Sequence, residues 1–178
     1  LVDKALAERV DFLLLAGDIY DRDWQDFHTG LFFRGQMVRL ERAGIRCFIV
    51  QGNHDAQGVI SRQLTLPSNV TVFSSRAAQT IRLDDLSVAI HGRSFPEREV
   101  NEDLVPSYPP PVPGFFNIGL LHTSLTGRAG HDTYAPTDLP TLVAKGYDYW
   151  ALGHVHAREV LNERPRIVFC GNLQGRHA

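Results

Sequence analysis

Short apolar runs, each closed by a cluster of polar residues, most constrain how this chain can fold. The run from Phe12 to Ala16 ends at Gly17, and a second run, Cys47 to Val50, ends at Gly52. Near-continuous apolar runs of this length are typical of strands that are covered on both faces in a parallel sheet. A helix fits between them, from about Phe27 to Ala43. This strand, helix, strand unit predicts an α/β fold with polar residues just beyond the strand ends.

Further apolar segments predict additional strands and helices. Val2, Leu6 and Val10 recur four residues apart, which predicts an amphipathic helix at the start of the chain. Asp84-Asp85 favours a turn between two short strands, so pairing in the middle of the chain is expected to be more antiparallel. Another helix is predicted between Thr137 and Lys145. The other expected strands are Val70 to Phe73, Thr80 to Leu83, Leu86 to His91, Phe116 to Leu121, Tyr149 to Leu152, Val160 to Leu161 and Ile167 to Phe169.

Length and proline content bear on domain organisation. Pro106 to Gly114 contains five prolines, which remove backbone donors and predict an irregular extended loop, or alternatively a linker. Strand patterns resume immediately after it, which favours the loop. With 178 residues, 43% of them hydrophobic, the chain can bury one sizeable core. We therefore expect one domain over residues 1–178.

Charge and cysteine content limit the classes of partner. The formal net charge of −2 gives no general attraction to nucleic acid or to an anionic membrane. No apolar run approaches the roughly 20 residues that span a bilayer, and no signal-peptide pattern occurs. Cys47 and Cys170 lie in apolar segments without metal-type spacing, so both are expected to be small core residues in a reducing compartment. A cytoplasmic protein is the resulting expectation.

Four polar clusters follow the apolar runs and carry the candidate chemistry. In open α/β sheets the carboxyl ends of strands meet at one edge, so these clusters are expected to converge. Their carboxylate, carboxamide and imidazole groups, without thiolates, suit divalent manganese, iron or zinc. The clusters are Gly17-Asp18-Ile19-Tyr20-Asp21, Gly52-Asn53-His54-Asp55, His122 and Gly153-His154-Val155-His156.

Each cluster alone has an ordinary structural explanation. Asp18 alone is typical of a helix cap or a turn, and Asn53-His54-Asp55 of a turn. A lone His122 is typical of a buried, hydrogen-bonded histidine. His154 and His156 are more specific, because side chains two apart on an extended segment point the same way. The presence of all four polar clusters in this order, each at the end of a predicted strand, favours a metal site.

The clusters resemble the motif series of the calcineurin-like metallophosphoesterases, which is D-x-H, G-D-x-x-D, G-N-H-[DE], a lone H and G-H-x-H. Four of these five motifs are present, between residues 17 and 156. The resemblance implies a sandwich of two mixed β-sheets flanked by helices. Three segments resemble, more narrowly, the DNA-repair exonuclease branch of the SbcCD nuclease subunit and its YhaO-like group. They are Gly17 to Phe33, Asn117 to Thr126 and Gly171 to His177.

The resemblance also implies a set of metal ligands. In the family pattern Asp18 bridges two divalent ions, for which manganese is expected and iron or zinc are alternatives. Asn53, His122 and His154 complete the shell of the second ion, and His156 belongs to the first. The family pattern places His54 at the substrate phosphate, as transition-state stabiliser or proton donor to the leaving oxygen.

By the same resemblance, Asp21 is a partner that orients the His54 ring. The implied reaction is two-metal hydrolysis of phosphodiesters. DNA is the implied substrate, cleaved by an exonuclease or endonuclease activity in DNA repair. Two alternatives stay open: a phosphatase or phosphodiesterase for small substrates, and a degenerate scaffold without catalysis. The branch further implies an SbcC-like ATPase subunit and a homodimer as partners, and no membrane.

The absent D-x-H motif is the departure from the family pattern. No such motif precedes Asp18, so the first ion has only Asp18 and His156 as ligands in this sequence. We expect that the catalytic domain is truncated at both ends and lacks its first strand, because Leu1 begins within a helical pattern and the expected ATPase-binding segment is absent after Ala178. Natural degeneracy is the alternative. In either case this chain by itself is expected to hold one metal better than two and to be poorly active.

Residues outside the motifs have two open interpretations each. Arg93 either contacts phosphate or is a solvated loop charge. His131 and Tyr134 either line the cleft or pack within their loop. A last group of aromatic residues either stacks nucleic-acid bases or, as we favour, packs a helix on the sheet. This group is Trp24, Phe27, Phe32 and Phe33.

Overall fold

The computed structural model of this chain describes residues 1–20, 27–56, 64–126 and 134–172. Its first elements are α1 (Val2–Glu8), β1 (Phe12–Leu15), α2 (Phe27–Arg42), β2 (Arg46–Ile49) and β3 (Val70–Val72). They are followed by β4 (Gln79–Leu83), β5 (Val88–Gly92), the 3₁₀ turn η1 (Val105–Ser107), β6 (Phe116–His122), α4 (Leu139–Ala144), β7 (Tyr149–Gly153), β8 (Glu159–Glu163) and β9 (Arg166–Phe169). Strands and helices therefore lie where the apolar patterns predicted them, with ends shifted by a few residues.

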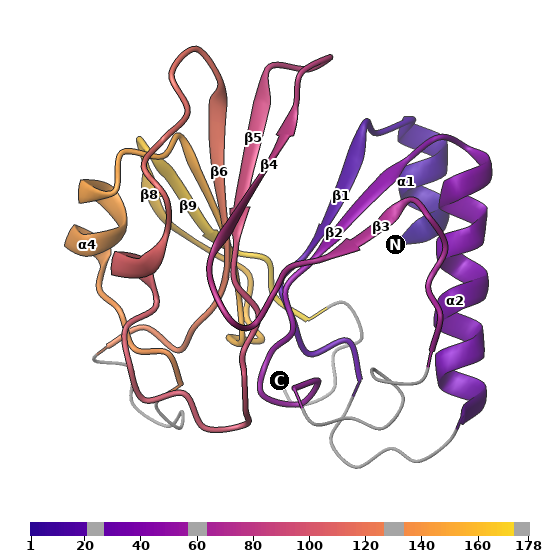
Figure 1. Ribbon diagram of the computed structural model, residues 1–178, viewed down its shortest axis with the longest axis horizontal. Helices are drawn as coiled ribbons and strands as arrows, with labels where there is room; N and C mark the ends of the chain where they lie inside the picture. Colours follow the sequence, from indigo (N-terminus) through magenta and orange to yellow (C-terminus); the bar gives the residue numbers. More distant parts are fainter. Residues whose placement is uncertain (21–26, 57–63, 127–133, 173–178) are drawn as a thin grey trace.

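Two sheets face each other, with helices on their outer sides (Figure 1). The smaller sheet has the order β1-β2-β3 and the larger one β4-β5-β6-β7-β9-β8. In Figure 1, α1 and α2 cover the outer face of the smaller sheet, and α4 lies outside the larger one. This arrangement confirms the predicted α/β sandwich. No helix in the described part of the chain has both the length and the apolar character needed to cross a bilayer.

Strand pairing follows the connections between the strands. β1, β2 and β3 pair in parallel, whereas β4 and β5 form an antiparallel pair across Asp84-Asp85. The expected antiparallel pairing is thus confirmed for β4 with β5, whereas β5 and β6, which lie on either side of the proline-rich loop, are parallel, as are β6 with β7 and β7 with β9. Residues 93–115 separate β5 from β6, and a long crossover of this kind returns the chain in the same direction. The carboxyl ends of β1, β2, β6 and β7 thereby meet at one edge.

Three apolar clusters hold these layers together. One lies between the sheets and includes Phe48, Phe73 and Leu120. A second packs α1 and α2 on the smaller sheet, and the third and largest lies on the outer side of the larger sheet around Trp150. Burial at roughly 25 cal/mol per Å² of apolar surface makes such clusters the main stabilising contribution.

Three expectations about burial were wrong, and two of them concern β1 and Cys170. The residues of β1 are half-buried rather than covered, because β1 pairs only with β2 among the described strands. Cys47 is buried as predicted, but Cys170 is exposed because it follows the last residue of β9, where the chain leaves the sheet.

The third wrong expectation about burial concerns which face of α2 packs on the sheet. Phe33, Met37 and Leu40 lie in the cluster beneath α2, at positions four and three residues apart on one helix face. Phe32 is 68% exposed, since the neighbouring position on a helix points about 100° away. Packing on the sheet is therefore confirmed for Phe33 and wrong for Phe32. Trp24 and the Phe27 side chain lie outside the described residues.

His91 is buried in a polar network that fixes the start of β6. Its Nε2 lies 3.0 Å from Asn117 Oδ1, which also accepts a hydrogen bond from Val112 N at 2.7 Å. Asn117 Oδ1 is thus an acceptor, so Nε2 carries the proton and Nδ1 accepts from Thr80 Oγ1 at 2.8 Å. Burial, and next the charge of Lys145, lower the pKa of His91, against the opposing hydrogen bond with Asn117.

Acidification should therefore destabilise the fold through His91. Because the folded-state pKa lies below the unfolded value, the unfolded chain binds more protons as pH falls below about 6.5. The contribution of His91 is complete above that pH and is lost toward lower pH. Urea unfolding with a chelator, at pH 7.5 and pH 5, should show a smaller loss in His91→Gln than in the wild type. The difference is limited to about 1.4 kcal/mol per pH unit. Equal losses in both proteins would exclude His91 as the source.

Candidate metal centre

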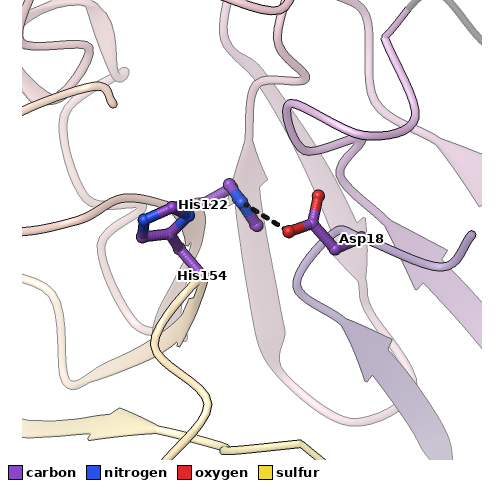
Figure 2. A group of neighbouring side chains, drawn as sticks. All are labelled: Asp18, His122 and His154. Atoms are coloured by element: carbon purple, nitrogen blue, oxygen red, sulfur yellow. Dashed lines mark ion pairs between the residues drawn. The ribbon is translucent and has the colours of Figure 1, made fainter. Parts of the chain in front are cut away.

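Three candidate ligands converge where the two sheets meet, as Figure 2 shows. Asp18 follows β1, His122 is the last residue of β6, and His154 follows β7. One possible ligand atom from each lies within 4.8 Å of the others. The clusters that are far apart in the sequence therefore do meet at the common edge of the strands.

His122 is the centre of this group. Its ring is fully buried, and Nδ1 lies 2.8 Å from the carbonyl oxygen of Ala16. A carbonyl oxygen only accepts, so Nδ1 carries the proton and Nε2 presents its lone pair. Nε2 faces Asn53 Oδ1 at 3.0 Å and Asp18 Oδ2 at 3.3 Å. Three acceptor atoms directed at one another fit the donor set of a divalent cation with nitrogen and oxygen ligands.

When no cation is bound and Nε2 of His122 is protonated as well, the charges of His122 and Asp18 stabilise each other. Burial alone favours neutral Asp18, but the hydrogen bond and charge of His122, and the nearby His54, outweigh it and lower the pKa of Asp18. Burial alone also disfavours protonated His122, yet the hydrogen bond and charge of Asp18 raise the pKa of His122. The site therefore favours a positive charge beside the Asp18 carboxylate, which a bound cation would also supply.

Two of the candidate ligands have an unusual backbone. Asp18 has a φ of 52° and His154 a φ of 94°. Positive φ costs non-glycine residues of order 1–3 kcal/mol and often occurs at functional sites, although Arg9, Ser87, Leu125 and Ala135, which are not candidate ligands, also have positive φ. The strain therefore coincides with the convergence of the ligands.

Glycines allow the two sheets to approach closely at this edge. A Cβ on Gly153 would lie 1.9 Å from the carbonyl oxygen of Ala16, and one on Gly52 would lie 2.5 Å from Asp18 Oδ1. Any larger residue at either position would push the loops after β1, β2 and β7 apart. The close approach of the two sheets therefore explains why Gly52 and Gly153 stand in the polar clusters.

Asp55 is a residue of the site to which sequence reasoning assigned no role. Its side chain is 1% exposed and accepts hydrogen bonds from the backbone amides of Ile19, Tyr20 and Gly52. Burial, followed by the negative charge of Asp18, raises the pKa of Asp55. Its place as the fourth residue of Gly52-Asn53-His54-Asp55 was the signal in the sequence, but two of its three partners, Ile19 and Tyr20, come from another loop.

Aromatic rings surround the two histidines. Phe95 packs edge-on against His122 with ring centroids 5.3 Å apart, and His122 packs similarly against His154 at 5.2 Å. Tyr134 packs edge-on against His154, with ring centroids 5.5 Å apart. Tyr134 therefore lies beside a candidate ligand and also packs against the core cluster around Trp150, so its interpretation as a cleft residue stays a prediction. Phe95 was missed, because nothing in the sequence distinguishes it from other core residues.

The remaining candidates are placed differently. His54 is half-buried, and its backbone amide donates to Asp18 Oδ1 at 3.1 Å. His156 is exposed and is not part of the group formed by Asp18, His122 and His154. Asp21 and His131 lie outside the described residues.

Arg93 is largely enclosed by its own loop region. Its guanidinium donates to Ser107 Oγ at 3.2 Å and lies 3.6 Å from Glu102 Oε1, and the side chain is only 14% exposed. The interpretation of Arg93 as a solvated loop charge is therefore wrong, because this side chain is used to hold neighbouring segments together. Nothing in these contacts favours a phosphate ligand.

Comparison with known proteins gives a consistent result. A model of the family described as calcineurin-like phosphoesterase matches residues 1–158. The chain is 38% identical to the uncharacterized metallophosphoesterase YhaO of Bacillus subtilis, over 99% of this chain and 44% of that protein.

More distant relatives carry names that refer to DNA repair and to a nuclease. Identity is 25% with the DNA double-strand break repair protein Mre11 of Sulfurisphaera tokodaii, over 90% of this chain and 42% of that protein. It is 21% with one of the subunits of the nuclease SbcCD of Escherichia coli K12, over 97% of this chain and 52% of that protein. The chain therefore spans about half the length of these relatives.

A methyl group at Gly153 should disrupt this edge. Gly153→Ala should lower the free energy of unfolding by about 1–3 kcal/mol through overpacking, and should weaken Mn²⁺ binding in calorimetry. Gly35→Ala is the matched control, because a Cβ at Gly35 within α2 meets nothing within 4 Å. That variant should gain up to about 1 kcal/mol from helix propensity. Similar effects of both changes would contradict the close approach at Gly153.

Proposed function

This chain belongs to the calcineurin-like phosphoesterase family, and we propose that it is the catalytic part of a two-cation phosphodiester hydrolase acting on DNA. The observation that carries the proposal is the convergence of Asp18, His122 and His154 at one edge of the sheets. Asn53 adds an amide oxygen beside His122.

The proposed ligands divide into two sets. Asp18, Asn53, His122 and His154 would hold one cation, and Asp18 together with His156 would contribute to a second. Their nitrogen and oxygen donors suit manganese, with iron and zinc as alternatives. When bound, two such cations supply Lewis acidity that lowers the pKa of the attacking water and neutralises charge on the phosphoryl oxygens.

The side chains of this protein then orient the ligands and move protons. The Ala16 carbonyl holds the His122 proton on Nδ1 and keeps the Nε2 lone pair directed at Asp18 and Asn53. We assign His54 to the substrate phosphate, where its protonated ring would donate a proton to the leaving ester oxygen. Its position beside Asp18 supports this role, since its backbone amide is bonded to that carboxylate. Asp21 is proposed to orient the His54 ring.

DNA is proposed as the substrate because two relatives carry names that refer to DNA repair and to a nuclease. An SbcC-like ATPase subunit and a second copy of the protein are proposed as partners because the motifs resemble the exonuclease branch, and the name of one relative refers to a nuclease with more than one subunit. A phosphoesterase for small substrates would use the same ligands, so fold and site alone do not separate the two.

Substrate preference should be tested with Mn²⁺ and four substrates. These are single-stranded DNA, nicked duplex DNA, bis-p-nitrophenyl phosphate and a phosphopeptide. We expect Mn²⁺-dependent cleavage of DNA, and its loss on addition of a chelator and in His122→Ala. Cleavage of only the small ester or the peptide would overturn the DNA proposal, and cleavage of none would overturn hydrolysis itself.

The role of His54 has a separate test. His54→Ala should keep the cation affinity measured by calorimetry, while turnover falls about 10²- to 10⁴-fold, the usual contribution of a general acid. His28→Ala is the matched control, because this histidine is exposed on α2. It should leave both quantities near the wild-type values. Loss of the cation in His54→Ala would instead make His54 a ligand.

A further inference from the structure

We propose that Asp55 is a positioning residue that holds the loops carrying Asp18 and Asn53 in their binding arrangement before any cation is present. The inference rests on the proposed cation site and adds a residue that acts on it through the backbone. Asp55 directs its carboxylate at three backbone amides. It is not part of the ligand group formed by Asp18, His122 and His154.

The contacts of Asp55 join two loops. Its Oδ1 accepts from Ile19 N at 3.0 Å and from Tyr20 N at 3.2 Å, in the loop after β1. Its Oδ2 accepts from Gly52 N at 3.2 Å, in the loop after β2, and also lies 3.2 Å from Ile19 N. Ile19 directly follows Asp18, and Gly52 directly precedes Asn53. One buried carboxylate therefore fixes the residues next to two candidate ligands.

A second bond crosses between the same loops in the opposite direction. The backbone amide of His54 donates to Asp18 Oδ1 at 3.1 Å, which leaves Oδ2 of the same carboxylate beside His122. Each loop thus supplies a carboxylate to amides of the other. Asp18 needs this support, because its φ of 52° is unfavourable for a residue with a side chain.

The chemistry of the contacts specifies a carboxylate at position 55. All three partners are N–H donors, and an ionised carboxylate accepts on both of its oxygens. The amide of asparagine would present an NH₂ group to one loop or the other, so that one set of bonds is lost. Loss of groups that hydrogen-bond metal ligands typically weakens metal binding 10- to 100-fold, and we expect an effect of this size from Asp55, which bonds the amides of residues beside two candidate ligands.

Ser94 provides a control for loss of a buried polar contact at the same loop. Its Oγ accepts from Gln51 N at 3.0 Å and donates to Phe73 O at 2.6 Å. Ser94 is as buried as Asp55 and is bonded to the residue before Gly52. The two partners, Gln51 and Phe73, follow β2 and β3, so neither bond reaches the loop after β1. Removal of this hydroxyl therefore tests local stability without separating the two loops.

The test compares Mn²⁺ affinity by calorimetry in the wild type, Asp55→Asn, Asp55→Glu and Ser94→Ala, with thermal unfolding measured in parallel. We expect Asp55→Asn to bind Mn²⁺ 10- to 100-fold more weakly and Ser94→Ala to stay within about threefold of the wild type. Asp55→Glu should recover part of the loss, because the carboxylate is restored. Asp55→Asn within threefold of the wild type would overturn the inference. A wild type that bound no Mn²⁺ would instead overturn the proposed function on which it rests.

If Asp55→Asn does not fold, amide hydrogen exchange in the cation-free wild type tests whether Asp55 holds the two loops in place before a cation binds. The amides of Ile19, Tyr20 and Gly52 should exchange at least about 100-fold more slowly than in an unstructured chain, because each is bonded to Asp55 before a cation binds. Exchange at the unstructured rate would show that the loops are not held in advance, and the inference would fail.

Discussion

The hydrogen bond between His122 Nδ1 and the Ala16 carbonyl oxygen, 2.8 Å long, connects the end of β6 to the end of β1. It links the two sheets at the edge where the candidate ligands meet. It also determines which nitrogen of His122 faces Asp18 and Asn53. Because the ring is fully buried, this contact cannot be exchanged for water without cost, and the positions of the surrounding loops depend on it.

Close approach is the second requirement of this edge. Gly153 contacts the Ala16 backbone so closely that no side chain fits, and Gly52 lies against Asp18 and His122. The apolar cluster between the sheets supplies the burial that draws them together, and the glycines allow the backbones to meet. Asp18 and His154 then adopt positive φ values that their surroundings must maintain.

Much of this arrangement could be predicted from residue patterns. The apolar runs located the strands, and their order with α2 indicated an α/β fold, while the sandwich of two sheets was implied by the family resemblance. The expectations for Cys170, Phe32 and β1 were wrong because burial depends on neighbours that a local pattern does not contain. The parallel pairing of β5 with β6 was likewise decided by the path of the intervening loop.

The sequence by itself determined which residue types stand at the strand ends, and those types already indicated a divalent cation, whereas phosphate chemistry was implied only by the resemblance of their order to a known family. Only the tertiary structure decided that Asp18, Asn53, His122 and His154 lie together, that His156 is exposed, and that Asp55 bonds the amides of another loop. The physical reason is that strand patterns arise from local periodicity, whereas distances between loops follow from how two sheets pack. Hydrogen bonds between residues 36 or more positions apart, such as Ile19 with Asp55, are set at that level.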